Sequence, residues 1–172
     1  MDELHFCPKC GEETLNWDGE KKLSCNQCSF VLYHNCAAAV AVVIRCGNEI
    51  MLTKRNQEPG KGKLDLAGGF SDPKESAEEA CARELKEELD IEIIPENLKI
   101  LLTLPNIYRY KDIDYNTLDI FFEYQVDKKF EAKLDISEVS EIAWIYENEI
   151  DLNEIAFNSQ KKFFQKYLNR NQ

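Results

Sequence analysis

Residues 69 to 91 constrain the fold and chemistry of this chain more than any other segment. Gly69 leads into a predicted helix that carries Glu84, Glu87 and Glu88. Helix positions i, i+3 and i+4 share one face within about 6 Å, so the three carboxylates lie close together. Like charges at that spacing repel each other and destabilise an isolated helix. Bound Mg²⁺ would offset the repulsion, because it takes oxygen ligands and bridges carboxylates to phosphates.

The sequence also predicts where this helix begins. Ser76 and Glu79 have the spacing of a capping box, which predicts that the helix begins there. Arg83 borders two of the carboxylates and is suited to hold them through bidentate hydrogen bonds. The carboxylates alone would equally fit a solvated acidic face, which is the usual outcome of a charge run. The wider spacing decides between the two interpretations.

That spacing resembles the Nudix box, G-x5-E-x7-R-E-U-x-E-E-x-G-U, in which U is a bulky aliphatic residue. The matching positions are Gly69, Glu75, Arg83, Glu84, Leu85, Glu87, Glu88 and Ile91. Asp90 replaces the second glycine of the pattern. Aspartate sometimes adopts the left-handed conformation that follows a helix, so Asp90 affects the turn and leaves the carboxylates in place.

Four cysteines near the N-terminus form a second pattern. Cys7, Cys10, Cys25 and Cys28 read C-x2-C, fourteen residues, C-x2-C, which matches a tetrahedral zinc site. Two disulfides or four unlinked thiols are the alternatives. The chain opens on polar and acidic residues without a signal peptide, which favours a reduced, cytoplasmic protein. All four zinc positions are filled, so the zinc is expected to be structural.

Length and charge limit the remaining possibilities. The 172 residues suit a zinc ribbon over 1–35 and a second domain over 36–172. No apolar run approaches the ~20 residues that span a bilayer, so no membrane partner is expected. The formal net charge of −11 argues against nucleic acid as a partner, since phosphates would be repelled. A homodimer is left open.

The pattern of apolar runs predicts mixed strands and helices, which indicates α/β layers. Pro105 is expected to lie in a loop that runs to about residue 116. The predicted strands are 37–46, 49–55, 98–104, 117–126 and 141–146, and a terminal amphipathic helix is predicted over 157–168.

A four-cysteine ribbon followed by a Nudix box resembles the NADH pyrophosphatase and ADP-ribose pyrophosphatase branch of the Nudix hydrolases. The resemblance implies an α/β/α Nudix sandwich with a mixed sheet, preceded by the small zinc ribbon. It also implies Mg²⁺- or Mn²⁺-dependent cleavage of a nucleoside diphosphate derivative. The alternative is a non-catalytic nucleotide sensor whose ribbon binds a partner. The complete set of carboxylates favours the enzyme.

The resemblance further implies roles for individual residues. The catalytic and metal-binding set is Arg83, Glu84, Glu87, Glu88 and the carbonyl of Gly68. Glu87 is either a metal ligand or the base. A later acidic residue joins the metal shell, and Glu141, ahead of Trp144, is the best match. Glu138 is the less favoured alternative.

Three residues are expected to contact the substrate. Tyr33 matches a substrate-contacting tyrosine after the ribbon, and Arg55 is a candidate phosphate contact. Tyr108 lies near a position linked with dinucleoside polyphosphate hydrolases, and Pro105 near one that marks ADP-ribose pyrophosphatases. The Ser-Gln-Pro-Trp type motif associated with NADH preference is missing. An ADP-ribose-like substrate is therefore favoured over NADH.

Overall fold

The structure is a computed structural model in which residues 4–169 are described. The chain divides into two compact units, the first ending at Cys36 and the second beginning at Ala37. No helix in the described range is long and apolar enough to cross a membrane.

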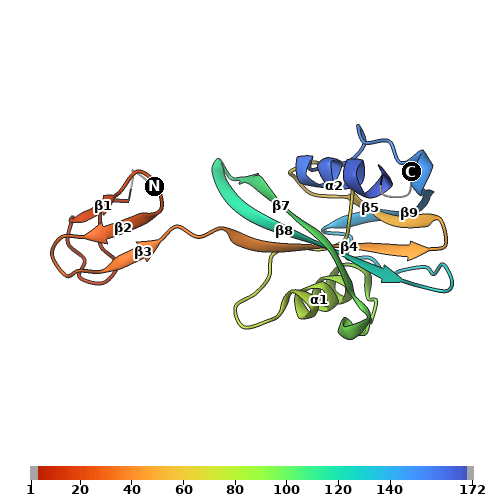
Figure 1. Cartoon of the computed structure of the whole chain (residues 1–172), viewed down its shortest axis with the longest axis horizontal. Helices are drawn as coiled ribbons and strands as arrows, with labels where there is room; N and C mark the ends of the chain where they lie inside the picture. Colours follow the sequence, from red (N-terminus) through yellow and green to blue (C-terminus); the bar gives the residue numbers. More distant parts are fainter. Residues whose placement is uncertain (1–3, 170–172) are drawn as a thin grey trace. The chain divides into compact units, whose positions relative to one another are not determined.

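The N-terminal unit is a small antiparallel sheet of three strands in the order β1-β2-β3 (Figure 1). The strands are β1 (Leu15–Trp17), β2 (Lys22–Cys25) and β3 (Val31–Tyr33). From residue 4 onward, the buried apolar residues of this unit are Leu15 and Leu23 together with Cys7 and Cys25. A unit of this size buries too little apolar surface to be stable alone, so it needs an additional source of folding free energy.

The second unit is built on one mixed sheet with the order β6-β5-β4-β8-β7, and β9 also pairs with β5. Among the strand pairs of residues 4–169, β4–β8 is parallel and the others in this sheet are antiparallel. The strands are β4 (Ala37–Cys46), β5 (Glu49–Arg55), β6 (Leu64–Asp65), β7 (Lys99–Tyr110), β8 (Ile113–Gln125) and β9 (Val139–Tyr146). The helices are α1 (Ala77–Leu89) and α2 (Asn158–Leu168), with short 3₁₀ turns at Pro95–Asn97 and Glu147–Glu149. The predicted mixed α/β architecture is confirmed.

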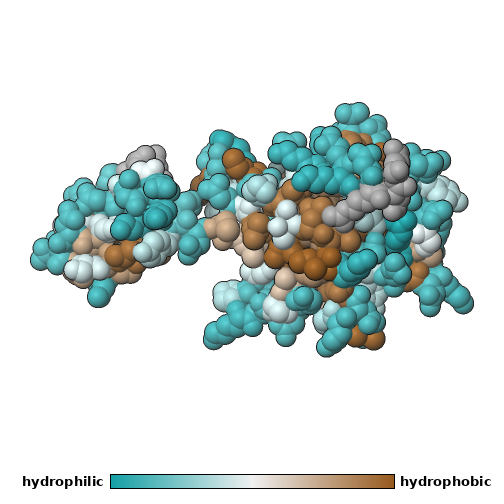
Figure 2. Space-filling model, in the orientation of Figure 1, coloured by the Kyte–Doolittle hydropathy of each residue, from teal (hydrophilic) through white to brown (hydrophobic). Residues whose placement is uncertain are grey.

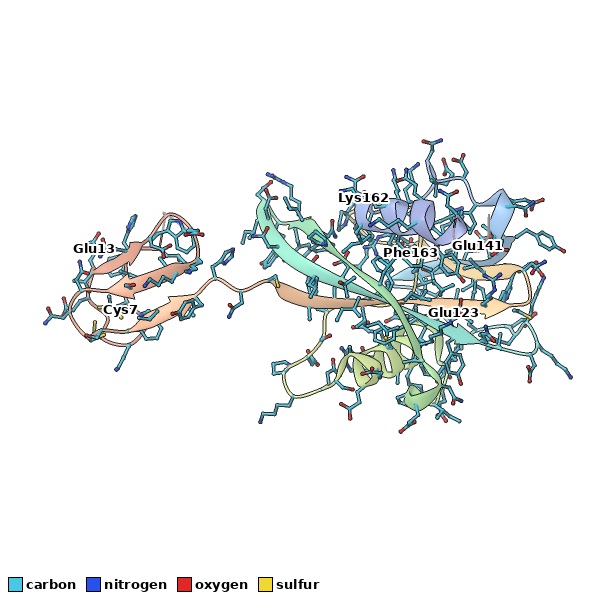
Figure 3. All side chains as sticks on the ribbon, viewed as in Figure 1. Cys7, Glu13, Glu123, Glu141, Lys162 and Phe163 are labelled. Carbon is cyan, nitrogen blue, oxygen red and sulfur yellow. The ribbon has the colours of Figure 1, made fainter. Side chains whose placement is uncertain are left out.

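The two helices cover opposite faces of the sheet (Figure 1). Alternation along β4 creates two cores, because Val42 packs with Leu85 of α1 whereas Val43 packs with Phe163 of α2. Figure 3 shows Phe163 directed from α2 toward the sheet, while Lys162 beside it is exposed. The sheet thus holds both helices at fixed positions beside its strand ends.

The predicted loop around Pro105 is wrong. β7 and β8 form one long hairpin, and Lys111 and Asp112 make its turn with φ of 47° and 63°. Pro105 lies inside β7, paired with Leu118. β7 is the outer strand of the sheet, and an edge strand tolerates a residue that cannot donate a ladder hydrogen bond.

The outer position of β7 also leaves apolar side chains uncovered. Ile100 and Ile107 are 60% and 65% exposed. Figure 2 shows hydrophobic surface over the middle of the second unit, with hydrophilic side chains around it. Exposed apolar patches often mark interaction sites. The homodimer nevertheless stays a prediction.

Candidate active site

The second unit contains an open cavity of about 570 Å³ that is lined by residues of both α1 and α2. Its volume suits a small organic ligand. Four groups of residues line it: small residues of β4 and the Gly68–Gly69 turn, carboxylates of α1, polar residues of the sheet, and aromatic residues. The aromatic rings are those of Phe70, Tyr108, Phe121 and Phe157.

The helix that supplies the carboxylates has well-defined ends. At its start, Glu79 N donates to Ser76 Oγ at 3.2 Å and Ser76 N donates to the Glu79 carboxylate at 2.7 Å, which confirms the capping box. At its end, Asp90 adopts the left-handed conformation with φ 55° and ψ 32°. Asp90 N donates to Lys86 O, and its carboxylate pairs with Lys86 Nζ at 2.6 Å. Aspartate therefore performs the role of the missing glycine.

Arg83 organises the carboxylates on this helix. Its Nη1 donates to Glu84 at 2.8 Å and to Glu87 at 3.1 Å. Nε and Nη2 donate to Glu75 at 3.1 and 2.7 Å, and Nη2 also donates to the Phe70 carbonyl at 2.9 Å. These hydrogen bonds, led by those to Glu75, raise the pKa of Arg83 above its usual value. The arginine links the helix to the turn before it.

Glu88 is the most unusual carboxylate of the site. Its Oε2 is buried and has no hydrogen-bond partner among the described residues. Burial first, and then the charges of Asp65, Glu84 and Glu138, raise the pKa of Glu88 well above its usual range, while the Gly68 N–H opposes that shift. A buried acceptor without a partner is costly. A cation at this position would fit it, because the donor set consists of carboxylate oxygens, which hard divalent cations prefer.

Gly68 and Gly69 allow the turn before the helix to pass close to its surroundings. Gly68 has φ of 146°, and a Cβ there would stand 2.1 Å from Val40 O. A Cβ on Gly69 would stand 2.6 Å from Glu84 Oε1. Both positions therefore exclude a side chain.

Substituting Gly68→Ala is expected to lower the free energy of unfolding by at least about 2 kcal/mol, since backbone must move. Chemical denaturation would measure it. Gly47→Ala is the matched control, because Gly47 also has positive φ, at 59°, but open space around its Cα. A Gly68→Ala cost no larger than that of Gly47→Ala would contradict the steric argument.

The structure does not bring Glu141 to the cavity. Glu141, labelled in Figure 3, lies on β9 with its side chain 63% exposed and a carboxylate oxygen 3.6 Å from Lys54 Nζ. Glu141 and Lys54 line a separate, smaller cavity. Glu138 lines the cavity instead, and its charge acts on both Glu84 and Glu88. Their places in the chain differ, because Glu141 is paired with Lys54 inside β9 whereas Glu138 lies in the turn immediately before that strand. Glu138, which the sequence favoured less than Glu141, is therefore the candidate that shares the cavity with the carboxylates of α1.

The other predicted substrate contacts divide between the two units. Arg55 and Tyr108 both line the cavity. Tyr33 lies on β3 of the N-terminal unit and is 55% exposed as a residue, and its contact with substrate stays a prediction. The long β7–β8 hairpin, which the sequence did not predict, carries Tyr108 to the cavity wall.

Several cavity residues were not predicted from the sequence. Asp65, Phe70, Phe157 and Gln160 line the wall around Arg55 and Tyr108. Tyr108 has its ring centroid 5.6 Å from that of Phe70 and 5.8 Å from that of Phe157. No local motif marks these residues. In the sequence, only their positions could have pointed to them: two lie near or within residues 69–91, and two lie within the predicted terminal helix over 157–168.

The four cysteines of the N-terminal unit form a compact cluster. Their sulfur atoms all lie within 4.8 Å of one another, with Cys7–Cys28 at 3.7 Å and Cys10–Cys25 at 3.8 Å. A tetrahedral site with Zn–S bonds of about 2.3 Å has sulfur separations near 3.8 Å. A disulfide would require about 2.05 Å. The cysteines are free and their geometry fits a metal ion.

Comparison with known sequences identifies a family and relatives of this chain. The family model of the NUDIX domain matches residues 34–167. The NAD-capped RNA hydrolase NudC of Pseudomonas fluorescens is 33% identical over 91 residues, which are 53% of this chain and 33% of that protein. The protein of the same name from Haemophilus influenzae is 34% identical over 90 residues, covering 51% and 34%. The match spans only about a third of the length of these curated relatives. These relatives are named as hydrolases of NAD-capped RNA, so the charge argument against nucleic acid as a partner is not supported.

Solved structures agree with the fold. A NUDIX hydrolase from Nitrosomonas europaea superposes with a TM-score of 0.66 at 24% identity, covering 97% of this chain and 94% of its own. The NUDIX domain of Shewanella oneidensis NrtR, crystallised with ADP ribose, gives a TM-score of 0.64 at 20% identity, covering 81% and 91%. At these identities the likeness establishes the architecture of the sheet and its helices.

Proposed function

Because the chain belongs to the NUDIX domain family, we propose that it is a metal-dependent hydrolase that cleaves the diphosphate bridge of a nucleoside diphosphate derivative. One observation carries the proposal. The Glu88 carboxylate is buried at the wall of an open cavity with an unpartnered oxygen, next to Glu84 and Glu138. A protein that needed only a stable core would gain nothing from this cluster of like charges.

Divalent cations, Mg²⁺ or Mn²⁺, are the proposed cofactors. Bound there, they would neutralise the diphosphate and lower the pKa of a bound water. The proposed ligands are Glu84, Glu87, Glu88, the Gly68 carbonyl and, in place of Glu141, Glu138. Arg83 holds Glu84 and Glu87 in position through its Nη1. One of these carboxylates accepts the proton of the attacking water.

The opposite wall of the cavity is proposed to bind the organic part of the substrate. Tyr108 is flanked by Phe70 and Phe157, so three rings surround one part of the cavity. Aromatic faces stack on nucleobases without requiring a particular base. These aromatic residues are proposed to bind the nucleoside group of the substrate. The charged residues that line the rest of the cavity, with the bound cations, are proposed to bind its phosphates.

ADP-ribose is expected to be hydrolysed at least as efficiently as NADH. The Ser-Gln-Pro-Trp type contact set is missing, whereas the carboxylates that act on the diphosphate are complete, so preference should shift without loss of cleavage. The products of ADP-ribose should be AMP and ribose 5-phosphate. Steady-state kinetics on ADP-ribose, NADH, NAD and diadenosine polyphosphates, each with Mg²⁺ and Mn²⁺, would measure this.

Two outcomes would contradict the substrate proposal. A kcat/KM for NADH more than about 10-fold above that for ADP-ribose would mean that about 1.4 kcal/mol of transition-state preference comes from other residues. Tight binding of ADP-ribose without hydrolysis would support the alternative, a nucleotide sensor with the ribbon as a partner-binding module.

The N-terminal unit is proposed to hold one structural Zn²⁺ through Cys7, Cys10, Cys25 and Cys28. All four ligands come from the protein, which leaves no open position for a reacting water. Metal binding would supply the folding free energy that the small core of this unit lacks.

A further inference from the structure

Arg55 is held in one orientation by contacts on three sides. Its Nη1 donates to Asp65 Oδ2 at 2.6 Å, and its Nε donates to the Pro59 carbonyl at 2.7 Å. Its guanidinium carbon lies 4.8 Å from the centroid of the Phe157 ring. The side chain is only 15% exposed. A guanidinium fixed this way has lost its rotational freedom before any ligand arrives.

Asp65 is itself fixed from a second direction. Gln160 Nε2 on α2 donates to Asp65 Oδ1 at 2.5 Å, and Gln160 Oε1 accepts a hydrogen bond from Leu66 N at 3.1 Å. The Asp65 side chain is 9% exposed. A buried ion pair is a weak source of stability, because desolvation of both charges opposes it. Its presence at a cavity wall therefore calls for a functional explanation.

The charges that line the cavity are strongly unbalanced. The lining carboxylates are Asp65, Asp72, Glu84, Glu87, Glu88, Asp119, Asp135 and Glu138. The lining cations are Arg55 and Arg83, with no lysine among the described lining residues. Arg83 directs all three of its nitrogens to Glu75, Glu84, Glu87 and the Phe70 carbonyl. Within residues 4–169 the hydrogen bonds of the Arg55 guanidinium are made by Nε and Nη1, which leaves Nη2 as the donor for an anion.

We infer that Arg55 binds one of the two phosphoryl groups of the substrate, namely the one that does not lie against the metal-binding carboxylates. Asp65 and Gln160 are the residues that position Arg55. The inference rests on the proposed function. Arg55 and Asp65 line the same cavity as the carboxylates of α1, so one ligand can contact both groups. A diphosphate held at one end beside Glu88 presents its other phosphoryl group to a nearby cation. Arginine suits that contact because its fork matches phosphate oxygens.

Two substitutions at Arg55 test the contact through steady-state kinetics on ADP-ribose. Arg55→Gln is expected to raise KM by at least about 10-fold and to change kcat by less than about threefold, as for a contact made equally in ground and transition states. Arg55→Lys should behave within about threefold of Arg55→Gln, because lysine keeps the charge but lacks the fork. Lys54→Gln is the matched control: it neighbours Arg55 on β5 but lies with Glu141 outside the cavity. An unchanged KM in Arg55→Gln would overturn the assignment.

A double-mutant cycle tests the positioning residues. Asp65→Asn alone is expected to raise KM by about 3- to 10-fold, and the double variant Asp65→Asn/Arg55→Gln should be no worse than Arg55→Gln alone. If circular dichroism shows that Asp65→Asn does not fold, Gln160→Ala takes its place in the same cycle. If the effects of the two substitutions on KM multiply independently, Asp65 or Gln160 does not act through Arg55 and its positioning role is wrong.

Calorimetric binding of ADP-ribose in the presence of a chelator separates this inference from the proposed function. Wild-type protein is expected to bind without added divalent cation, and Arg55→Gln to bind at least about 10-fold more weakly. If the wild-type protein hydrolyses no diphosphate, the proposed function fails while weaker binding by Arg55→Gln still supports the anion contact. Equal binding by both proteins overturns the inference whatever the activity.

Discussion

Replacing Glu88 with glutamine is expected to lower kcat by at least about 100-fold while the fold persists. The amide has almost the shape of the carboxylate but lacks its charge, so it serves neither as a metal ligand nor as a base. Glu87→Gln should cause a loss of similar size. Steady-state turnover of ADP-ribose with Mg²⁺ and with Mn²⁺ measures both. Near wild-type turnover in the two variants would remove these residues from the mechanism.

The same substitution should stabilise the metal-free protein. Burial and neighbouring carboxylates raise the pKa of folded Glu88 well above its usual range, whereas the unfolded chain titrates near 4.3. The folded state thus holds the proton more tightly, and stability falls as pH rises from about 4.3 toward the folded pKa. Glutamine does not titrate, so Glu88→Gln should lose that part of the pH dependence. Thermal unfolding at several pH values with a chelator would show it.

A pair of substitutions on and near β9 provides the control. Glu138→Gln removes a carboxylate from the cavity and should lower kcat by about 10-fold or more, whereas Glu141→Gln should stay within about twofold of the wild type. The opposite ranking would place the later metal ligand at Glu141, as the sequence resemblance first implied.

Local signals in the sequence predicted the parts of the fold that depend on local chemistry. The capping box at Ser76 and Glu79 defines the start of α1, and the apolar run 37–46 coincides with β4. The carboxylates of α1 were predicted together because helical spacing alone places them on one face. Asp90 as a left-handed residue also follows from local conformational preference.

Parts that depend on tertiary position could not be predicted in this way. Proline usually marks a loop, but Pro105 lies within β7 because β7 has a neighbour on one side only. The choice between Glu138 and Glu141 depends on where the chain enters β9, because Glu138 lies in the turn before that strand and Glu141 inside it, paired with Lys54. Gln160 is distant from Asp65 in sequence, and no spacing rule connects residues of α2 and β6. Such contacts arise only when the sheet brings both elements to one cavity.

Loss of one cysteine of the cluster is expected to unfold the N-terminal unit before the second unit. The protein should contain about one zinc per chain, resistant to mild chelation. Cys7→Ser or Cys25→Ser removes a ligand, and the apolar core of this unit, centred on Leu15 and Leu23, is too small to compensate. The second unit has two cores of its own and should keep its thermal transition.

Elemental analysis of zinc combined with hydrogen exchange would follow both units separately. Cys36→Ser is the matched control, because Cys36 is exposed and lies outside the four-sulfur cluster, so zinc content should not change. Protein purified in reducing buffer without zinc, or with disulfides mapped among the four cysteines, would contradict the metal assignment. Sulfur separations near 3.8 Å are too long for a disulfide and match the edges of a zinc tetrahedron. The geometry therefore predicts that ligand loss acts through the metal and not through a broken covalent bond.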